Sequence, residues 1–285
     1  MSKIGIDYDL AIHNGAHIYL PHWIEAQEGW GNVKIPEMSQ IYGATHYDTV
    51  QQYPLGTLLV KSDRKWRYIQ YGDQDAAQVW GAGTGQPLDN CCLMGSTALE
   101  VSTVMKTNAA DANPILITEA SVSANDFAGG YLVVQSGSRT WMGHIISNTA
   151  SATSPANEVE LTMEAPCPFA LTSSYTVMIT KSRYKDVVLH SGASAEMGYE
   201  VVGVHNGSYS TVDCEGYWGW VQTRGPTFLV IATSHQGDAH AERMLVCKNG
   251  AGQCEASTTN QILGWYMQEY DASTLAYPLV FLTLE

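Results

Sequence analysis

The sequence has few charged residues. Asp, Glu, Lys and Arg make up 15% of its 285 residues, with 14 basic against 28 acidic side chains. The resulting net charge of −14 excludes the basic surface that binds a nucleic-acid backbone, so we expect no nucleic-acid partner. With 45% hydrophobic residues, the chain can still bury a large core. Scarce charge beside abundant Gly, Ser, Thr, Tyr and Trp is typical of β-rich proteins.

Long hydrophobic runs are also missing. No apolar stretch of 18 residues occurs, and residues 1–7 lack the apolar core and cleavage site of a signal peptide. We therefore expect no membrane partner and synthesis in the cytoplasm, where the six cysteines stay reduced. Cys247 and Cys254 flank a turn-forming segment and would lie opposite each other across a strand pair, which keeps a disulfide between them as the alternative.

Familiar catalytic motifs are absent. No Gly-x-Ser-x-Gly elbow occurs, and the glycine-rich residues 81–85 lack the Lys-Ser/Thr pair of a phosphate loop. His13, His17 and His22 fit no familiar zinc spacing, and residues 235–242 favour a polar loop. We predict no catalytic residue, no metal and no cofactor, and a chain that is not an enzyme.

The hydrophobic pattern alternates over many short runs separated by turn residues. It predicts a mainly β fold with β-sandwich or barrel domains and an extended aromatic-rich N-terminal arm. We expect four segments. They are an N-terminal arm at 1–52, a small β-rich segment with a short helix at 53–112, a β-sandwich or barrel domain at 113–190, and a C-terminal β domain at 191–285.

Individual strands follow from the same pattern. Residues 61–64 should connect a hairpin, 136–138 should form a second hairpin turn, and 147–157 should form a surface loop. The final run, which ends at Glu285, should be tied into a sheet. Residues 53–60 should form a turn that leads into a strand. The other expected strands are 65–72, 115–118, 130–135, 139–146, 159–163, 175–179, 187–189, 243–247, 262–267 and 279–285.

The segment from Gly216 to Pro226 predicts a central strand. Because side chains alternate along a strand, Tyr217 and Val221 should lie on one face and Trp218 and Trp220 on the other. Both faces are then covered by other structure, and Gly225-Pro226 should supply a bend. We take Tyr217, Trp218, Trp220, Arg224 and Pro226 as a structural motif.

Residues 1–52 are apolar but have no sustained period, which is unusual for a free loop. We interpret them as an arm that packs on its own body or on a neighbouring subunit, with a short helix near 36–41. The candidate assembly contacts are aromatic: Tyr19, Trp23, Trp30, Tyr42 and Tyr47.

Several stretches resemble recurrent blocks in structural proteins of tailed bacteriophages. They are Leu161–Leu171 with Pro166 and Pro168, then Ser182–Val188, Gly129–Leu132 and Gly216–Pro226, and an N-terminal signature formed by Tyr53–Thr57 with Arg67–Tyr68. The resemblance covers residues 53–231. It implies a virion protein of the capsid decoration (cement) type on the outside of the head.

The implied partners are the major capsid protein and further copies of this chain, as a homotrimer. Two other functions stay open at this point. One is a phage tail or fibre component that binds host surface glycans through exposed Trp and Tyr. The other is a carbohydrate-active enzyme with a pair of carboxylates.

Overall fold

The computed structural model describes most of the chain in several stretches, and these stretches form two compact units. Described residues between 98 and 183 form the barrel unit, and those before 98 and after 183 form the sheet unit. Within them, no helix has the length and hydrophobicity needed to span a membrane. The described residues are 11–13, 16–19, 35–38, 41, 47–72, 92–94, 100–136, 139–155, 157–189, 200–206, 216–229, 244–248, 251–254, 261–267 and 279–285.

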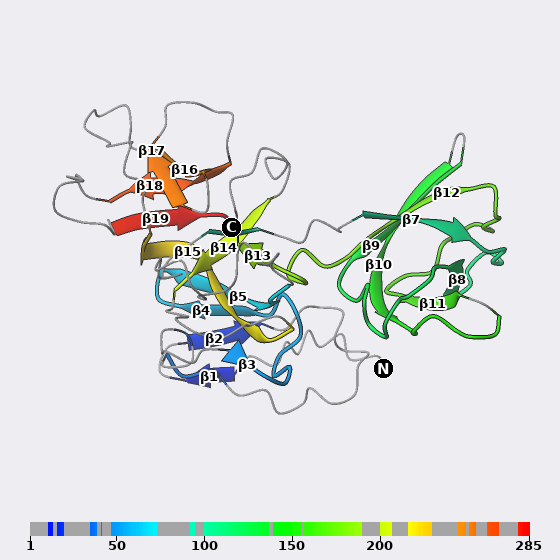
Figure 1. The fold of residues 1–285 in the computed structure, drawn as a ribbon, viewed down its shortest axis with the longest axis horizontal. Coiled ribbons are helices and arrows are strands. Elements are labelled where there is room, and N and C mark those ends of the chain that lie inside the picture. Colours follow the sequence, from blue (N-terminus) through cyan, green and yellow to red (C-terminus); the bar gives the residue numbers. More distant parts are fainter. Residues whose placement is uncertain are drawn as a thin grey trace, which may run out of the picture. The chain divides into compact units, whose positions relative to one another are not determined.

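The sheet unit is built on one large antiparallel sheet (Figure 1). Its main strand order is β1-β2-β4-β5-β15-β19-β18-β16-β17, with β3, β6, β13 and β14 attached beside this path. The strands are β1 (Ala11–His13), β2 (Ala16–Tyr19), β3 (Tyr47–Asp48), β4 (Leu58–Lys61), β5 (Arg64–Gln70), β6 (Cys92–Met94), β13 (Val188–Leu189), β14 (Val201–His205), β15 (Trp218–Phe228), β16 (Met244–Lys248), β17 (Ala251–Cys254), β18 (Ile262–Tyr266) and β19 (Leu279–Thr283).

Strand β15 is central, as predicted from its two-sided aromatic pattern. It pairs with β5, β14, β19 and β3. On one face, Trp220 packs with Trp66 and Tyr68 in a buried aromatic cluster. On the other face, Val221 packs with Tyr71 and other buried residues. The alternation read from the sequence is therefore confirmed.

The bend expected at Gly225-Pro226 does not end the strand. The left-handed φ of +90° at Gly225 lets the backbone pass close to Asp63, where a Cβ atom would lie 2.4 Å from the Asp63 carbonyl oxygen. At this point β15 changes partner. Its first half pairs with β5, and its second half, from Arg224 to Phe228, pairs with β19.

The barrel unit is a closed six-stranded barrel in the order β10-β11-β8-β7-β12-β9, drawn in green in Figure 1. The β9–β10 hairpin was predicted from the sequence and is confirmed. Inward side chains such as Leu132, Ile145 and Ile179 form the core. The strands are β7 (Glu100–Met105), β8 (Ile115–Thr118), β9 (Tyr131–Ser136), β10 (Arg139–Asn148), β11 (Glu158–Met163) and β12 (Thr176–Thr180).

A turn-rich segment between β8 and β9 contributes the buried side chains of Val122 and Phe127 to the barrel core. Asn148 holds this segment. Its Oδ1 accepts the Phe127 N–H at 2.8 Å, and its Nδ2 donates to Ser123 O at 2.9 Å and Thr149 O at 2.8 Å. Asn148 is buried at the end of β10, so the predicted surface loop begins later than residue 147.

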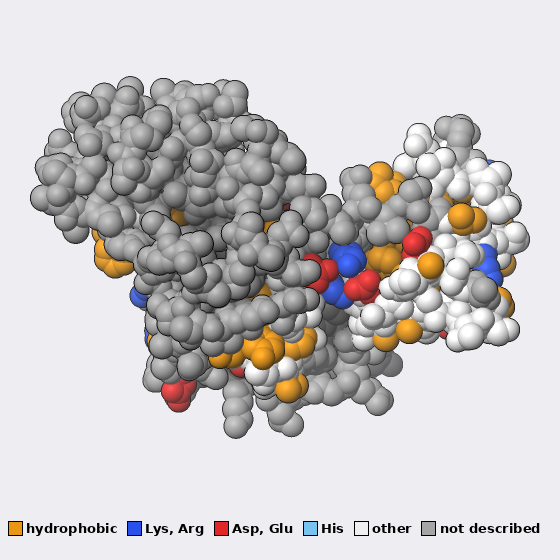
Figure 2. Space-filling model, viewed as in Figure 1, with side chains coloured by type: hydrophobic (Ala, Val, Ile, Leu, Met, Phe, Trp, Pro, Cys, Tyr) orange, Lys and Arg blue, Asp and Glu red, His pale blue; other side chains and the backbone are white. Residues whose placement is uncertain are grey.

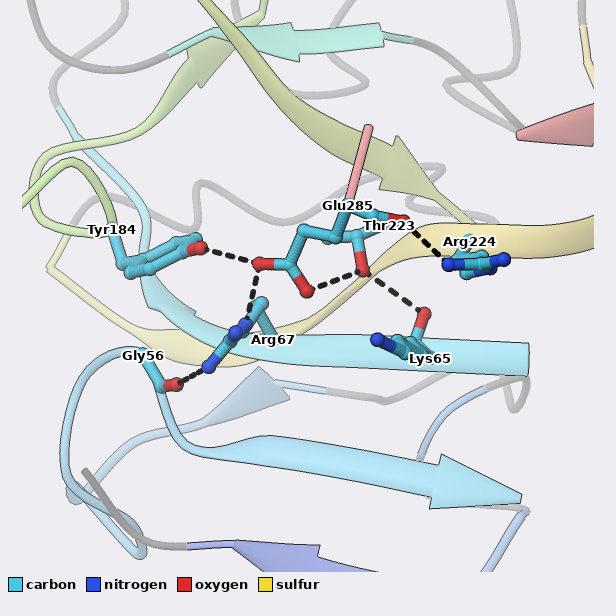
Figure 3. A network of polar contacts seen from close by, with 7 residues as sticks. All are labelled: Gly56, Lys65, Arg67, Tyr184, Thr223, Arg224 and Glu285. Atoms are coloured by element: carbon cyan, nitrogen blue, oxygen red, sulfur yellow. Dashed lines mark hydrogen bonds and ion pairs between the residues drawn. The ribbon is translucent and has the colours of Figure 1, made fainter. Parts of the chain in front are cut away.

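A polar network joins segments that are distant in sequence (Figure 3). The Glu285 carboxylate accepts hydrogen bonds from Arg67 Nε at 2.7 Å and from the Tyr184 hydroxyl at 2.9 Å. Arg67 also donates to Gly56 O at 2.7 Å, and Arg224 donates to Glu285 O at 3.2 Å. Together with the pairing of β19 with β15 and β18, this network confirms that the final run belongs to the sheet.

The described parts of residues 1–52 belong to the sheet unit and pack on it. Strand β2 pairs with β4, and Ile18 and Ile41 are buried in the aromatic cluster that contains Trp66. Of the short helix expected near 36–41, residues 36–38 and 41 are described, and the Ile41 N–H donates to Met38 O at 3.1 Å. The other short helix, expected at 73–80 in the segment 53–112, lies outside the described residues. The chain divides into units near residues 98 and 184, whereas the sequence pattern placed divisions at 112/113 and 190/191.

The register of β16 and β17 corrects one prediction. The two strands form the expected hairpin, but Cys254 lies opposite Leu245 and Cys247 lies opposite Gly252. The two cysteines are therefore not directly opposite each other, because the turn is shorter than their spacing suggested.

Candidate interaction surface

Apolar side chains occupy one face of the sheet formed by β15, β19 and β18. In one row across the strands, Pro226 pairs with Phe281, which pairs with Trp265. In the next row, Phe228 pairs with Leu279, whose carbonyl accepts the Met267 N–H at 3.1 Å. We call these six residues the aromatic face.

The two aromatic rings at the centre of this face are stacked. The Trp265 and Phe281 ring centroids lie 5.0 Å apart, and the ring planes differ by only 4°. Gly264 makes this approach possible. Its φ is +154°, and a Cβ atom there would lie 1.8 Å from the Phe281 carbonyl oxygen. Any other residue would push β18 away from β19 and separate the rings.

The aromatic face remains accessible although its own strands are covered on the opposite side. Phe228 is 55% exposed, and Trp265 and Met267 are each 48% exposed, whereas the intervening Val280 and Leu282 are fully buried in a core cluster. Figure 2 shows hydrophobic side chains reaching the surface of the described residues in several places. Contiguous exposed apolar patches of this kind mark sites of interaction.

Within the part of the chain that the structure describes, few polar groups border the aromatic face. Thr283 follows Phe281 along β19, and its pairing partner Arg224 is exposed on β15. The six residues themselves include no charge. Aromatic residues and Met are enriched at protein interfaces, and charge is usual at their rim, so this composition is compatible with an interaction surface.

The structure separates the five residues of the predicted motif into two groups. Trp220 is buried, and Trp218 and Tyr217 are partly buried against the two core clusters. Arg224 and Pro226 instead lie at or on the exposed aromatic face. The motif therefore builds the central strand at one end and contributes to a surface at the other.

The predicted assembly contacts are only partly within the described residues. Tyr19 is exposed at the end of β2. Tyr47 is partly buried and stacks on Tyr217, with ring centroids 5.1 Å apart. Trp23, Trp30 and Tyr42 lie outside the described residues. The role of the arm in assembly stays a prediction.

Sequence reasoning missed Trp265, Phe281, Phe228, Met267 and Leu279 as surface residues. It identified the apolar runs that contain four of them, but a continuous apolar run does not show which face stays uncovered. The sequence did contain one usable signal. Large aromatic rings occupy alternate positions in these strands, and a small sheet rarely has room to bury such rings on both of its faces.

An aromatic and carboxylate cluster lies under the opposite side of β15. The rings of Tyr53, Tyr68 and Trp220 lie 5.0 to 5.1 Å apart in edge-on contacts. The Tyr68 hydroxyl donates to Asp48 Oδ2 at 2.8 Å. Burial raises the pKa of Asp48, and burial together with the nearby Asp48 charge raises the pKa of Tyr53 to about 12.

Nothing in the described residues gathers into a metal centre, since no three His, Cys, Asp or Glu side chains are placed to hold an ion there. Of the candidate groups considered from sequence, His17 is partly buried on β2, and Glu158 forms an ion pair with Lys106. Residues 81–85 and 235–242 lie outside the described part. No family model, curated protein or solved structure matches this chain.

Proposed function

We propose that this chain is a structural protein of a tailed-bacteriophage particle, a capsid decoration protein that binds the outside of the head and stabilises it. The observation that carries the proposal is the aromatic face, which presents six apolar side chains on a folded sheet. The resemblance of residues 53–231 to blocks of phage structural proteins supports the virion context. The net charge of −14 favours a position away from packaged DNA.

The exposed area sets the strength of such a contact. Side chains of this size cover 150–250 Å² each, so Trp265, Phe228 and Met267 together expose about 300 Å² of apolar surface. Covering that surface would contribute roughly 7 kcal/mol before any cost is subtracted. Association costs about 4 to 15 kcal/mol in lost freedom, so one aromatic face binds weakly. A repetitive shell suits such a contact because it offers the same site many times.

The main test is attachment to purified virus particles. The copy number of this chain relative to the major capsid protein, from quantitative mass spectrometry, should be a simple ratio repeated over the shell. A variant with Trp265→Ser and Phe228→Ser should lose most of its co-sedimentation with particles. Val50→Ser is the matched control, because Val50 is 66% exposed but lies outside the aromatic face.

Two results would contradict the proposal. Absence of the chain from purified particles would remove the virion context. Unchanged attachment of the double variant would show that another surface makes the contact, and deletion of residues 1–52 would then test the arm.

One observation favours a second function, which is binding of host glycans by a tail or fibre component. Trp265 is 48% exposed and its ring lies parallel to the Phe281 ring, so it offers a flat aromatic surface on which a sugar ring can stack. Glycan sites also need hydrogen-bonding groups around the ring, and among the described residues this face offers Thr283 and Arg224 at its edge. Sugar-dependent quenching of Trp fluorescence that is lost in Trp265→Ser would favour this second function.

A further inference from the structure

The outside of the barrel unit has a neutral side and an acidic side. On the acidic side, β11 directs Glu158 and Glu160 outward, and Glu164 follows the strand. On the opposite side, the outward positions of β10, β9 and β12 carry no Asp, Glu, Lys or Arg, and the exposed Arg139 lies at the start of β10 beside them. This division is notable in a chain with 28 acidic residues.

The register defines the neutral side as three rows across the strands. The middle row has Met142 opposite Val133 and Val133 opposite Met178. The flanking rows continue the same alternation. We call the following ten residues the neutral grid: Thr140, Gln135, Thr176 and Val104 in the first row, Met142, Val133 and Met178 in the second, and His144, Tyr131 and Thr180 in the third.

The centre of the neutral grid is apolar and accessible. Met142 is 63% exposed and Met178 is 37% exposed, while the neighbouring Tyr131 is 44% exposed. Met and Tyr are enriched at protein interfaces, and Met adapts its shape to the surface that it meets. Carboxylate residues lie at both ends of the third row. The Glu164 carboxylate lies 3.6 Å from His144 Nδ1, and Glu100 on β7 pairs with Thr180, while the rest of the grid has no charged residue.

We infer that the neutral grid is a contact surface for a second copy of this chain. Two copies with a net charge of −14 each repel one another, and carboxylates brought together at an interface would add to that repulsion. Contact through two neutral grids avoids this cost and keeps the acidic sides of the two barrels apart. A basic partner, in contrast, would be drawn to the acidic side.

The size of the grid predicts a reversible contact. With strands about 4.8 Å apart and outward residues about 6.7 Å apart, ten positions cover roughly 300 Å². A standard interface takes about 800 Å² from each partner, so free copies should associate only at high concentration. Copies held side by side on a shell would have a high effective concentration, and the weak contact would then be occupied.

The test is sedimentation velocity of the purified full-length chain over a dilution series. The weight-average sedimentation coefficient should rise with concentration, and added salt should strengthen the association because it screens the repulsion between acidic copies. Met142→Glu, which places a carboxylate at the centre of the grid, should abolish the rise. Ala120→Glu adds the same charge at an exposed position after β8, away from β9 in the barrel, and should leave association unchanged.

Trp265→Ser separates this inference from the proposed function, because it should lose particle binding but retain self-association. A chain that stays monomeric up to about 1 mM, well above the range of specific contacts, would overturn the inference. So would association that persists in Met142→Glu, provided that the circular dichroism spectrum shows the variant folded. Association lost only in Trp265→Ser would assign self-contact to the aromatic face instead.

Discussion

Replacing Asn148 by Ala should open the segment that closes the barrel. The substitution removes three hydrogen bonds from a side chain that is 5% exposed, those to Phe127 N, Ser123 O and Thr149 O. Leaving the buried Phe127 N–H without its acceptor should cost about 1–3 kcal/mol, and the two carbonyls should add about 1 kcal/mol together. We expect a loss of roughly 3 kcal/mol in the free energy of local opening.

Hydrogen exchange followed by mass spectrometry measures this loss directly. At about 1.4 kcal/mol per factor of ten, a loss of 3 kcal/mol should speed exchange in peptides spanning residues 122–130 by about a hundredfold. Peptides from β5 in the sheet unit should not change. Gln135→Ala, at an exposed position of β9, is the control. Exchange at Phe127 that stays within about threefold of the parent chain would refute the reasoning.

Three further predictions concern the buried or partly buried side chains of Asp48, Arg67 and Cys167. Since burial raises the pKa of Asp48, its contribution to stability is full below about pH 4 and is lost as the pH rises through the raised pKa. Asp48→Asn should therefore gain stability relative to the parent chain between about pH 4 and pH 7 in urea unfolding. Arg67→Met should cost about 1–3 kcal/mol by breaking the contacts to Glu285 and Gly56. Burial also raises the pKa of the Cys167 thiol, so Cys167 should be alkylated only when the barrel opens.

For each of these three predictions, a different result would contradict the reasoning. A stability difference for Asp48→Asn that does not change with pH would show that the carboxyl is not desolvated in solution. Wild-type stability of Arg67→Met would mean that the Glu285 network is solvated and contributes nothing. Rapid alkylation of Cys167 in the native protein would place the thiol at the surface.

The local parts of the fold could be predicted because local chemistry determines them. Alternation within β5 put Trp66 and Tyr68 on one face and Ile69 on the other, and turn residues located the hairpins. Pairing of β15 with β5 and β19 could not be predicted, because it joins residues that are more than 50 positions apart for β19 and more than 140 for β5, and it depends on how the clusters pack. For the same reason, the sequence pattern did not show that the barrel unit interrupts the sheet unit.

The apolar pattern that predicted the strands of the aromatic face did not show that one side of these strands is exposed. A continuous apolar run normally belongs to a strand covered on both sides. Strand β19 has such a run, yet only Val280 and Leu282 are buried by the chain's own residues, while Leu279 and Phe281 lie on the aromatic face. The apolar run thus predicts a strand that is buried on both faces, whereas the described residues bury it fully on one face. The missing cover is the physical reason to expect a partner at this face.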